Sequence, residues 1–324
     1  MAGPCPDSGA PAVASSLVAD SITGPMEAFA AEIGGPDAGT VTVVGGRTRW
    51  AVGGAPVPGT REVRAPAGVV AVESAEMTVR VRAGTTVADL DAELAPTGQC
   101  VALPDRPGAT VGGVLAVGWS GLRRLGWGPV RDTLLEARVV NADGDVVKVG
   151  GPTVKNVSGY DLCRLLVGSL GTLALIGEVV LRTRPSPTAS RWLSGEADPF
   201  LLRSRLLRPS AVLWDGTTTW VLLEGHAADV DAEAGVAGEL GLTDCADDRF
   251  PDLASLPYRR SLPAADIRHL TGRFVAEVGV GVVHVDRPVP APPLAPPVDR
   301  LHERLKAVFD PTGRLNPGRD PRRR

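Results

Sequence analysis

The chain has 324 residues, of which 44% are hydrophobic and 22% charged, and its formal net charge is −3. This length predicts two domains, since a domain usually has about 100–200 residues, and the composition is ordinary for a soluble globular protein. Neither half has the basic excess of a nucleic-acid-binding protein, and we expect the short basic run 319–324 to be a solvated tail.

Up to residue 183, the sequence predicts short helices and strands. Predicted β-rich stretches lie at 41–44, 69–72 and 77–82, followed by a hairpin of 134–140 and 146–149. Predicted helices lie at 25–33, directly after Gly84-Thr85-Thr86, and at 161–167. The second of these helices carries Val87, Leu90 and Leu94 on one face. Residues 172–183 fit either a helix that passes into a strand or one long strand.

A break at 184–187, Arg-Pro-Ser-Pro, is the expected boundary between two domains, 1–185 and 186–324. Beyond it, a strand, a helix, two strands and a helix are predicted at 191–195, 199–207, 211–214, 218–224 and 229–240. This order is typical of a small α+β layer with an antiparallel sheet. A strand-rich stretch, a proline-rich linker and an amphipathic helix follow at 273–285, 288–297 and 298–309.

The cysteines and the apolar runs exclude several classes of protein. Cys5, Cys100, Cys163 and Cys245 lie far apart, so there is no Cys-x-x-Cys site for zinc or an iron–sulfur cluster. No apolar run approaches the ~20 residues that span a bilayer, and the first ten residues do not resemble a secretion signal. We therefore expect a cytoplasmic protein without a metal site.

The predicted strand 41–44 runs into a glycine-rich loop that ends at Gly54. Glycines after a strand let backbone N–H groups point into one concavity, which suits phosphate oxygens. The loop is neither a P-loop nor Gly-x-Gly-x-x-Gly, which disfavours nucleotide hydrolysis and an ordinary Rossmann site. A simple hairpin turn is the alternative.

A second glycine-rich element, 103–118, places Thr110, Gly112 and Gly113 before an apolar helix. Free amides at a helix start favour an anion, and the small residues Gly113 and Ala116 would let a flat ring approach. Tight packing of the helix on a sheet would explain the same pattern.

A third element reads Lys155-Asn-Val-Ser-Gly-Tyr160-Asp-Leu, followed by Gly168-Ser-Leu-Gly-Thr-Leu. In order, spacing and residue types, the three elements resemble the FAD-binding domain of the vanillyl-alcohol oxidase (PCMH-type) superfamily. Within it, the chain is most similar to the shorter FAD-binding subunits of bacterial glycolate oxidases, at 109–132, 150–178 and 309–319. The resemblance implies an α+β fold, with a two-lobed PCMH-type FAD-binding domain and a small antiparallel-sheet cap domain.

The resemblance also implies which residues hold the cofactor. The loop 45–50 should wrap the FAD pyrophosphate mainly with backbone amides, and Thr110, Gly112 and Gly113 should line the flavin or its ribityl–phosphate arm. Ile176 matches a position that contacts the cofactor through its backbone. The full expected set is Gly45, Gly46, Arg47, Thr48, Arg49, Trp50, Pro104, Thr110, Gly112, Gly113, Ala116, Lys155, Ile176 and Asn316.

All four histidines lie beyond residue 225. Covalent flavin attachment in the superfamily normally uses a histidine near the first glycine loop, where Arg47 and Thr48 stand here, so the FAD is expected to be non-covalent. His284 has only Asp286 as a local partner, which is too little for a metal site, and a structural role is the simpler interpretation.

Candidate catalytic residues are few. Arg123 and Arg124 could clamp the carboxylate of a 2-hydroxy acid, but they could equally bind a phosphate or an acidic surface of a partner subunit. Tyr160, like Lys155, could donate a hydrogen bond at the flavin edge or serve only the structure. No base for hydride abstraction is evident, so this chain is not expected to carry the main hydroxy-acid oxidation site.

The resemblance implies an FAD-dependent oxidoreductase, namely the FAD-binding subunit of a glycolate (2-hydroxy acid) oxidase complex. The implied partners are a larger flavin-containing subunit and an iron–sulfur subunit, with at most peripheral membrane association through the complex. One alternative is a stand-alone FAD-dependent oxidoreductase of a small hydroxylated substrate. Another is a non-catalytic assembly subunit with a degenerate flavin site.

Overall fold

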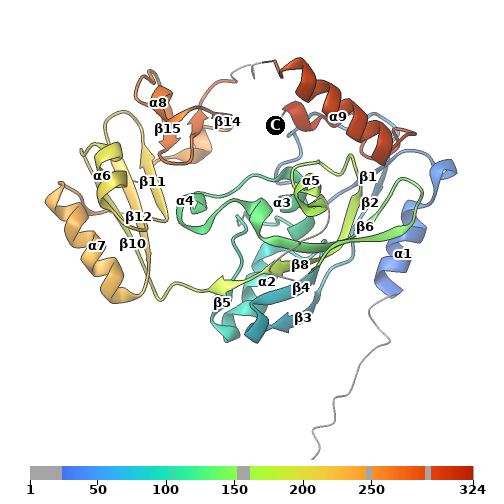
Figure 1. The fold of residues 1–324 in the computed structure, drawn as a ribbon, viewed down its shortest axis with the longest axis horizontal. Helices are drawn as coiled ribbons and strands as arrows, with labels where there is room; N and C mark the ends of the chain where they lie inside the picture. Colours follow the sequence, from blue (N-terminus) through green and yellow to red (C-terminus); the bar gives the residue numbers. More distant parts are fainter. Residues whose placement is uncertain (1–23, 105, 152–160, 246–249, 289–292, 324) are drawn as a thin grey trace, which may run out of the picture.

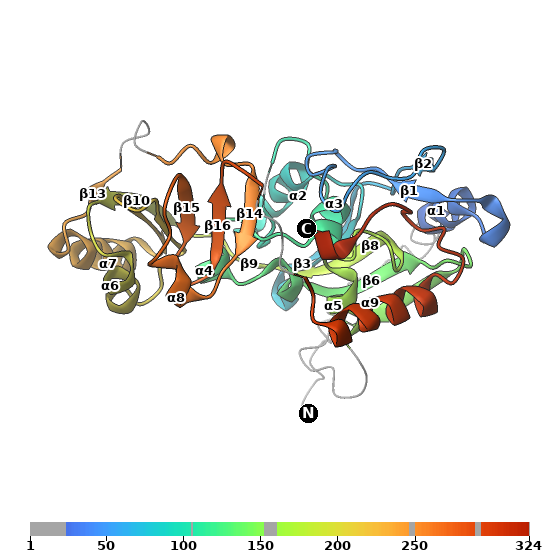
Figure 2. The same ribbon diagram turned by 90° about the horizontal axis from the view of Figure 1, so that it is seen from above.

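The computed structural model describes residues 24–104, 106–151, 161–245, 250–288 and 293–323. Two antiparallel sheets form two lobes that lie side by side, and the end of the chain returns to the first lobe (Figure 1, Figure 2). Helices pack on both sheets, so the predicted α+β class is confirmed.

The first lobe is built on a five-stranded sheet in the order β3-β4-β8-β6-β7. Its strands are β3 (Val69–Glu73), β4 (Thr78–Arg82), β6 (Leu134–Val140), β7 (Val146–Gly150) and β8 (Leu175–Arg182). Seven of the eight residues of β8 are buried, which is typical of a central strand. Of the two interpretations of 172–183, the long strand is therefore right, with its start at Leu175.

A parallel pair and four helices complete the described part of this lobe. They are β1 (Val41–Val43), β2 (Arg61–Val63), α1 (Gly24–Ile33), α2 (Val87–Leu94), α3 (Val111–Val117) and α5 (Leu162–Leu166). Helix α4 (Arg124–Trp127) packs on the second lobe through Leu125. Helix α2 follows its sequence pattern: the Thr86 hydroxyl accepts from the Asp89 amide as an N-cap, and Val87, Leu90 and Leu94 are buried in the core.

The second lobe is built on a seven-stranded sheet in the order β13-β10-β12-β11-β15-β16-β14. Its strands are β10 (Ala189–Gly195), β11 (Ala211–Trp214), β12 (Thr219–Gly225), β13 (Thr243–Asp244), β14 (Tyr258–Ser261), β15 (Phe274–Glu277) and β16 (Val282–Val285). Its helices are α6 (Pro199–Arg205), α7 (Ala227–Glu239) and α8 (Ala264–Ile267). Strand β14 was not predicted, because Tyr-Arg-Arg-Ser lacks an apolar alternation.

The chain crosses between the lobes twice. On the way out, β9 (Arg184–Pro185) pairs with β5 (Gln99–Cys100) of the first lobe before β10 begins. On the way back, helix α9 (Pro296–Phe309) leads to a segment that joins β1: the Val41 amide donates to the Arg314 carbonyl at 2.9 Å, and the Asn316 amide to the Val41 carbonyl at 2.8 Å. Both ends of the described chain thus support the first lobe.

Candidate functional site

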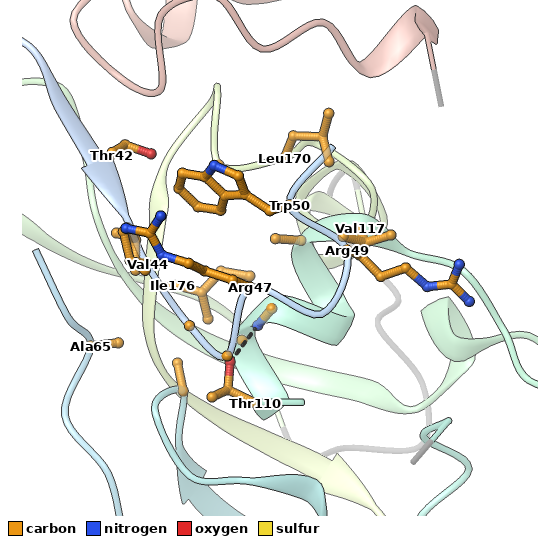
Figure 3. A pocket seen from close by; sticks show the side chains of 18 of the residues that line it. Thr42, Val44, Arg47, Arg49, Trp50, Ala65, Thr110, Val117, Leu170 and Ile176 are labelled. Atoms are coloured by element: carbon orange, nitrogen blue, oxygen red, sulfur yellow. Dashed lines mark hydrogen bonds between the residues drawn. The ribbon is translucent and has the colours of Figure 1, made fainter. Parts of the chain in front are cut away.

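The loop 44–50 after β1 forms one wall of a cleft in the first lobe (Figure 3). A Cβ atom on Gly46 would lie 1.6 Å from the carbonyl oxygen of Gly108, and one on Gly45 would lie 2.3 Å from the Thr110 hydroxyl oxygen. Backbone approaches its neighbours so closely at these positions that only glycine fits.

Five consecutive amides of this loop have no acceptor of their own. In the part of the chain that the structure describes, the N–H groups of residues 45–49 donate to nothing, whereas the flanking Val44 amide donates to Val63 O at 2.8 Å and the Trp50 amide to Arg47 O at 3.2 Å. Successive free backbone N–H groups form a concavity that binds anions. The loop therefore suits a diphosphate.

Two arginines leave the loop in opposite directions (Figure 3). Arg47, in the left-handed region with φ of 54°, donates to the Glu62 carboxylate at 2.6 and 2.8 Å and lies 4.7 Å from the Trp50 ring centroid. The Arg49 guanidinium lies 4.6 Å from the ring centroid of Trp119. The two guanidiniums thus lie over different tryptophan rings.

Helix α3 offers the cleft a smooth surface rather than free amides. The Val111 amide donates to Thr85 O at 2.9 Å, the Gly112 amide to Ala83 O at 2.8 Å, and the Gly113 amide to the Thr110 hydroxyl at 3.2 Å. The expectation of free amides here is wrong, because the turn between β4 and α2 and the Thr110 cap use them. Gly112 instead permits close packing, since its Cβ would lie 2.7 Å from that of Ala83.

Two buried polar atoms that line the cleft have no partner among the described residues. They are the Thr42 hydroxyl oxygen and the Asn316 side-chain oxygen. The Asn316 amide nitrogen, by contrast, donates to Leu170 O at 2.8 Å, which fixes the side chain. A buried polar atom without a partner is costly, so these two atoms favour a polar ligand in the cleft.

The chain end also supplies Arg319, which the sequence did not single out. Its guanidinium lies 4.2 Å from the Trp50 ring centroid and donates to the carbonyls of Trp50 and, at 2.9 Å, Val52. The Asp320 amide donates to Gly53 O at 2.8 Å. The expectation that residues 319–324 form a solvated tail is therefore wrong for Arg319 and Asp320. Their partners lie near the other end of the sequence, where no local pattern reveals them.

Most of the residues expected to hold the cofactor lie on this cleft. Those that line it are Gly45, Gly46, Arg47, Thr48, Arg49, Trp50, Thr110, Gly112, Gly113, Ala116, Ile176 and Asn316. Pro104 lines a neighbouring cavity instead, while Lys155 and the catalytic candidate Tyr160 lie outside the described residues. Lining residues without a sequence signal include Thr42, Ala65, Leu170 and Arg319.

The neighbouring cavity, about 510 Å³ in volume, lies between the two lobes. Thr48, Arg49, Gly113 and Val117 line both the cleft and this cavity. A ligand of the cleft would therefore border the cavity along α3 and the end of the glycine loop.

The two arginine candidates of the first lobe are placed differently. The Nε atom of Arg123 donates to both carboxylate oxygens of Glu224 on β12, at 2.9 and 3.0 Å, which links the lobes. Arg124 begins α4 and lines a separate polar hollow. Arg123 is thus engaged by a carboxylate of its own chain.

His284 has a different partner from the one expected. Its Nε2 atom lies 2.8 Å from Oε1 of Glu277, which is buried on the adjacent strand β15, whereas Asp286 is exposed. The Arg259 guanidinium lies 3.7 Å from the same Glu277 oxygen. Strand pairing, which brings residues seven apart together here, explains why a sequence-local search missed Glu277. No cluster of three or more metal-ligating side chains occurs among the residues described.

Two arginines beside the cavity have lowered pKa values. Burial, followed by repulsion from Arg106 and Arg259, lowers the pKa of Arg49 to about 10. Burial also lowers the pKa of Arg259, against the attraction of Glu277. At neutral pH the Arg49 guanidinium remains charged.

Comparison with known proteins matches residues 37–150 to a family described as FAD binding domain. The glycolate oxidase subunit GlcE of Escherichia coli (strain K12) is 32% identical over 86% of this chain and 92% of that protein. The D-lactate dehydrogenase of Archaeoglobus fulgidus is 44% identical over 32% of this chain and 24% of its own length. The glycolate oxidase subunit GlcD of Bacillus subtilis is 41% identical over 26% of this chain and 18% of its own length.

The fold is also found in a solved structure of an alkyldihydroxyacetonephosphate synthase. That structure superimposes with a TM-score of 0.65 over 90% of this chain and 73% of its own, at 14% sequence identity. The likeness covers both lobes and concerns the fold alone. No helix in the described ranges is long and apolar enough to cross a membrane.

Proposed function

The chain belongs to the family of glycolate oxidase subunit GlcE, and from that premise we propose that it is the FAD-binding subunit of a glycolate (2-hydroxy acid) oxidase complex. The observation that carries the proposal is the run of five free amides at residues 45–49, in a loop that lines the same cleft as most of the other expected cofactor residues. An FAD-dependent oxidoreductase needs such a place for the diphosphate of its cofactor.

The residues of the cleft fit the parts of FAD. The loop amides would hold the diphosphate, the smooth surface of α3 at Gly113 and Ala116 would accept a flat ring, and the free oxygens of Thr42 and Asn316 would accept hydrogen bonds. Bound FAD supplies a two-electron acceptor that can pass electrons on singly. Because Arg47 and Thr48 stand where a covalently linked histidine would be needed, we propose that the FAD is held non-covalently.

The proposed partners are a larger flavin-containing subunit of the GlcD kind and an iron–sulfur subunit that receives the electrons. The proposed substrate of the complex is a small 2-hydroxy acid, and any association with a membrane would be peripheral, through the complex. The likeness to both GlcE and GlcD supports the first partner, because both are named as subunits of glycolate oxidase.

The first test is the flavin content of the purified full-length chain after expression with riboflavin. We expect about one FAD per chain by visible absorbance, released into the supernatant by acid precipitation because it is non-covalent. A colourless protein that also fails to bind added FAD would contradict the proposal and favour an assembly subunit with a degenerate site.

The second test separates a complex subunit from a stand-alone enzyme. Glycolate is added anaerobically to the flavin-loaded chain, alone and co-purified with a GlcD-type subunit, and bleaching of the flavin is followed. Rapid bleaching only with the partner supports the complex. Equally rapid bleaching of the chain alone would support the stand-alone oxidoreductase.

A further inference from the structure

Among the described residues, the lining of the cavity between the lobes carries an excess of positive charge. Of these residues, four arginines line it, Arg49, Arg106, Arg123 and Arg259, against a single carboxylate, Glu277. Glu224 engages Arg123, and Glu277 lies 3.7 Å from Arg259. Within the described ranges, no carboxylate lies within 4.0 Å of Arg49 or Arg106, so these two guanidiniums have no counter-charge among those residues.

Two of these arginines are fixed in place by the same aromatic ring. The guanidiniums of Arg49 and Arg259 lie 4.6 and 5.1 Å from the ring centroid of Trp119, although they come from different lobes. Arg259 also donates to Ser120 O at 3.3 Å, and only 10% of its side chain is exposed. Because both side chains are already ordered, less entropy is lost when they bind a ligand.

Arg49 connects this cation pair to the cofactor cleft. Its amide is one of the five free N–H groups of the glycine loop, while its side chain lies at Trp119 beside the interlobe cavity. The cavity also shares Gly113 and Val117 of α3 with the cleft. A ligand bound by the guanidinium in this cavity would therefore border the surface of α3 that would accept the flat ring of the cofactor.

We propose that the interlobe cavity of this chain binds a small organic carboxylate, and that Arg49 and Arg259 are the residues that contact it. Guanidiniums are suited to the planar, bidentate recognition of a carboxylate. The inference rests on the proposed function for the nature of the ligand, and it gives the FAD-binding subunit a substrate-sized anion site of its own.

The electrostatics of the pair support this assignment. Burial is the largest cause of the lowered pKa of Arg49, and repulsion from Arg106 and Arg259 adds to it. An anion between these groups would relieve that repulsion and favour their charged forms. Glu277 does not supply this negative charge to Arg49, because its carboxylate is shared between Arg259 and His284.

The test is calorimetric titration of the full-length chain, at known flavin content, with oxalate. Oxalate is a planar carboxylate without a C–H bond to oxidise, so binding is measured apart from activity. We expect one site per chain in the unmodified protein. Arg49→Gln should weaken binding roughly 10- to 100-fold, as expected for a lost charge-assisted contact, and Arg49→Lys by less. Circular dichroism of each variant verifies folding.

A matched control removes the same charge elsewhere. Arg205 is exposed at the end of α6 in the second lobe, outside the lining of the cavity, so Arg205→Gln should leave oxalate binding unchanged. Absence of oxalate binding to the unmodified protein, or equal binding by Arg49→Gln and Arg205→Gln, would overturn the carboxylate site. Flavin present without oxalate binding would leave the proposed function standing, whereas oxalate binding to a chain unable to bind FAD would overturn the proposed function alone.

Discussion

At position 46, the loop that lines the cleft lies so close to the backbone of Gly108 that a larger residue would displace the loop. In Gly46→Ala, the added methyl group would meet the Gly108 carbonyl at 1.6 Å, so the loop that carries the free amides must move. Tenfold weaker binding requires a loss of only ~1.4 kcal/mol, and we expect FAD affinity to fall roughly tenfold or more. The measurement is fluorescence titration of flavin-free protein with FAD.

The matched control for Gly46→Ala is another glycine-to-alanine change. Gly235 lies in helix α7 of the second lobe, and a Cβ there has no atom within 4 Å. Gly235→Ala should therefore leave FAD affinity at the level of the unmodified chain. If Gly46→Ala also binds FAD with unchanged affinity, the assignment of the loop to the diphosphate is wrong.

Cys163 illustrates how burial controls reactivity at the residue scale. Its thiol is buried against the carbonyls of Leu135 and Val149, and burial raises its pKa to about 11. At pH 8 the folded protein should therefore keep this thiol protonated, and iodoacetamide should modify it only after denaturation. Peptide mass spectrometry of the native and urea-treated protein checks this. Rapid native modification would mean that this part of the first lobe opens readily.

At the scale of elements, helix α7 contains two residues that weaken it. Gly235 and Gly238 are exposed and occupy helical positions, and a Cβ atom added to either would have no neighbouring atom within 4 Å. Gly235→Ala and Gly238→Ala should each raise the free energy of unfolding by about 0.5–1 kcal/mol, because alanine loses less backbone entropy in a helix. Urea unfolding followed by circular dichroism measures the change. A decrease in either variant would show that alanine does not fit the native helix at that position.

Elements with a strong local pattern were predictable, and those defined by pairing partners were not. Helix α2 has a capping threonine and three apolar residues on one face, and the prediction is confirmed. Strand β14 carries two arginines, and only its pairing with β16 makes it a strand. It is β14 that brings Arg259 to the cavity, so the sequence could not indicate this part of the site.

The same division applies to the cleft. The glycine loop is one continuous segment of the sequence and the start of α3 is another, and the family resemblance located both. The orphaned oxygen of Thr42 and the contacts of Arg319 depend on segments that meet only after folding. Glu277 and His284 are seven residues apart, yet their contact follows from the turn and register between β15 and β16.

For the whole molecule, the cleft depends on both ends of the described chain. Helix α1 near the start and the segment after α9 meet at Arg314, which is 2% exposed. Its guanidinium donates to Ile33 O at 2.8 Å, Gly34 O at 2.9 Å, and Gly39 O and Ala142 O at 3.0 Å. The same segment then delivers Asn316 and Arg319 to the cleft.

This arrangement predicts that stability and cofactor binding are coupled through Arg314. Arg314→Met removes the donors of four carbonyls, two of them in buried residues, and should lower the free energy of unfolding by about 3 kcal/mol. It should also weaken FAD binding, although Arg314 does not line the cleft, because Asn316 and Arg319 are no longer held. Urea unfolding and FAD titration measure the two effects, with Arg205→Met as the control for loss of charge. Destabilisation with full FAD affinity would show that the chain end stabilises the lobe without shaping the cleft.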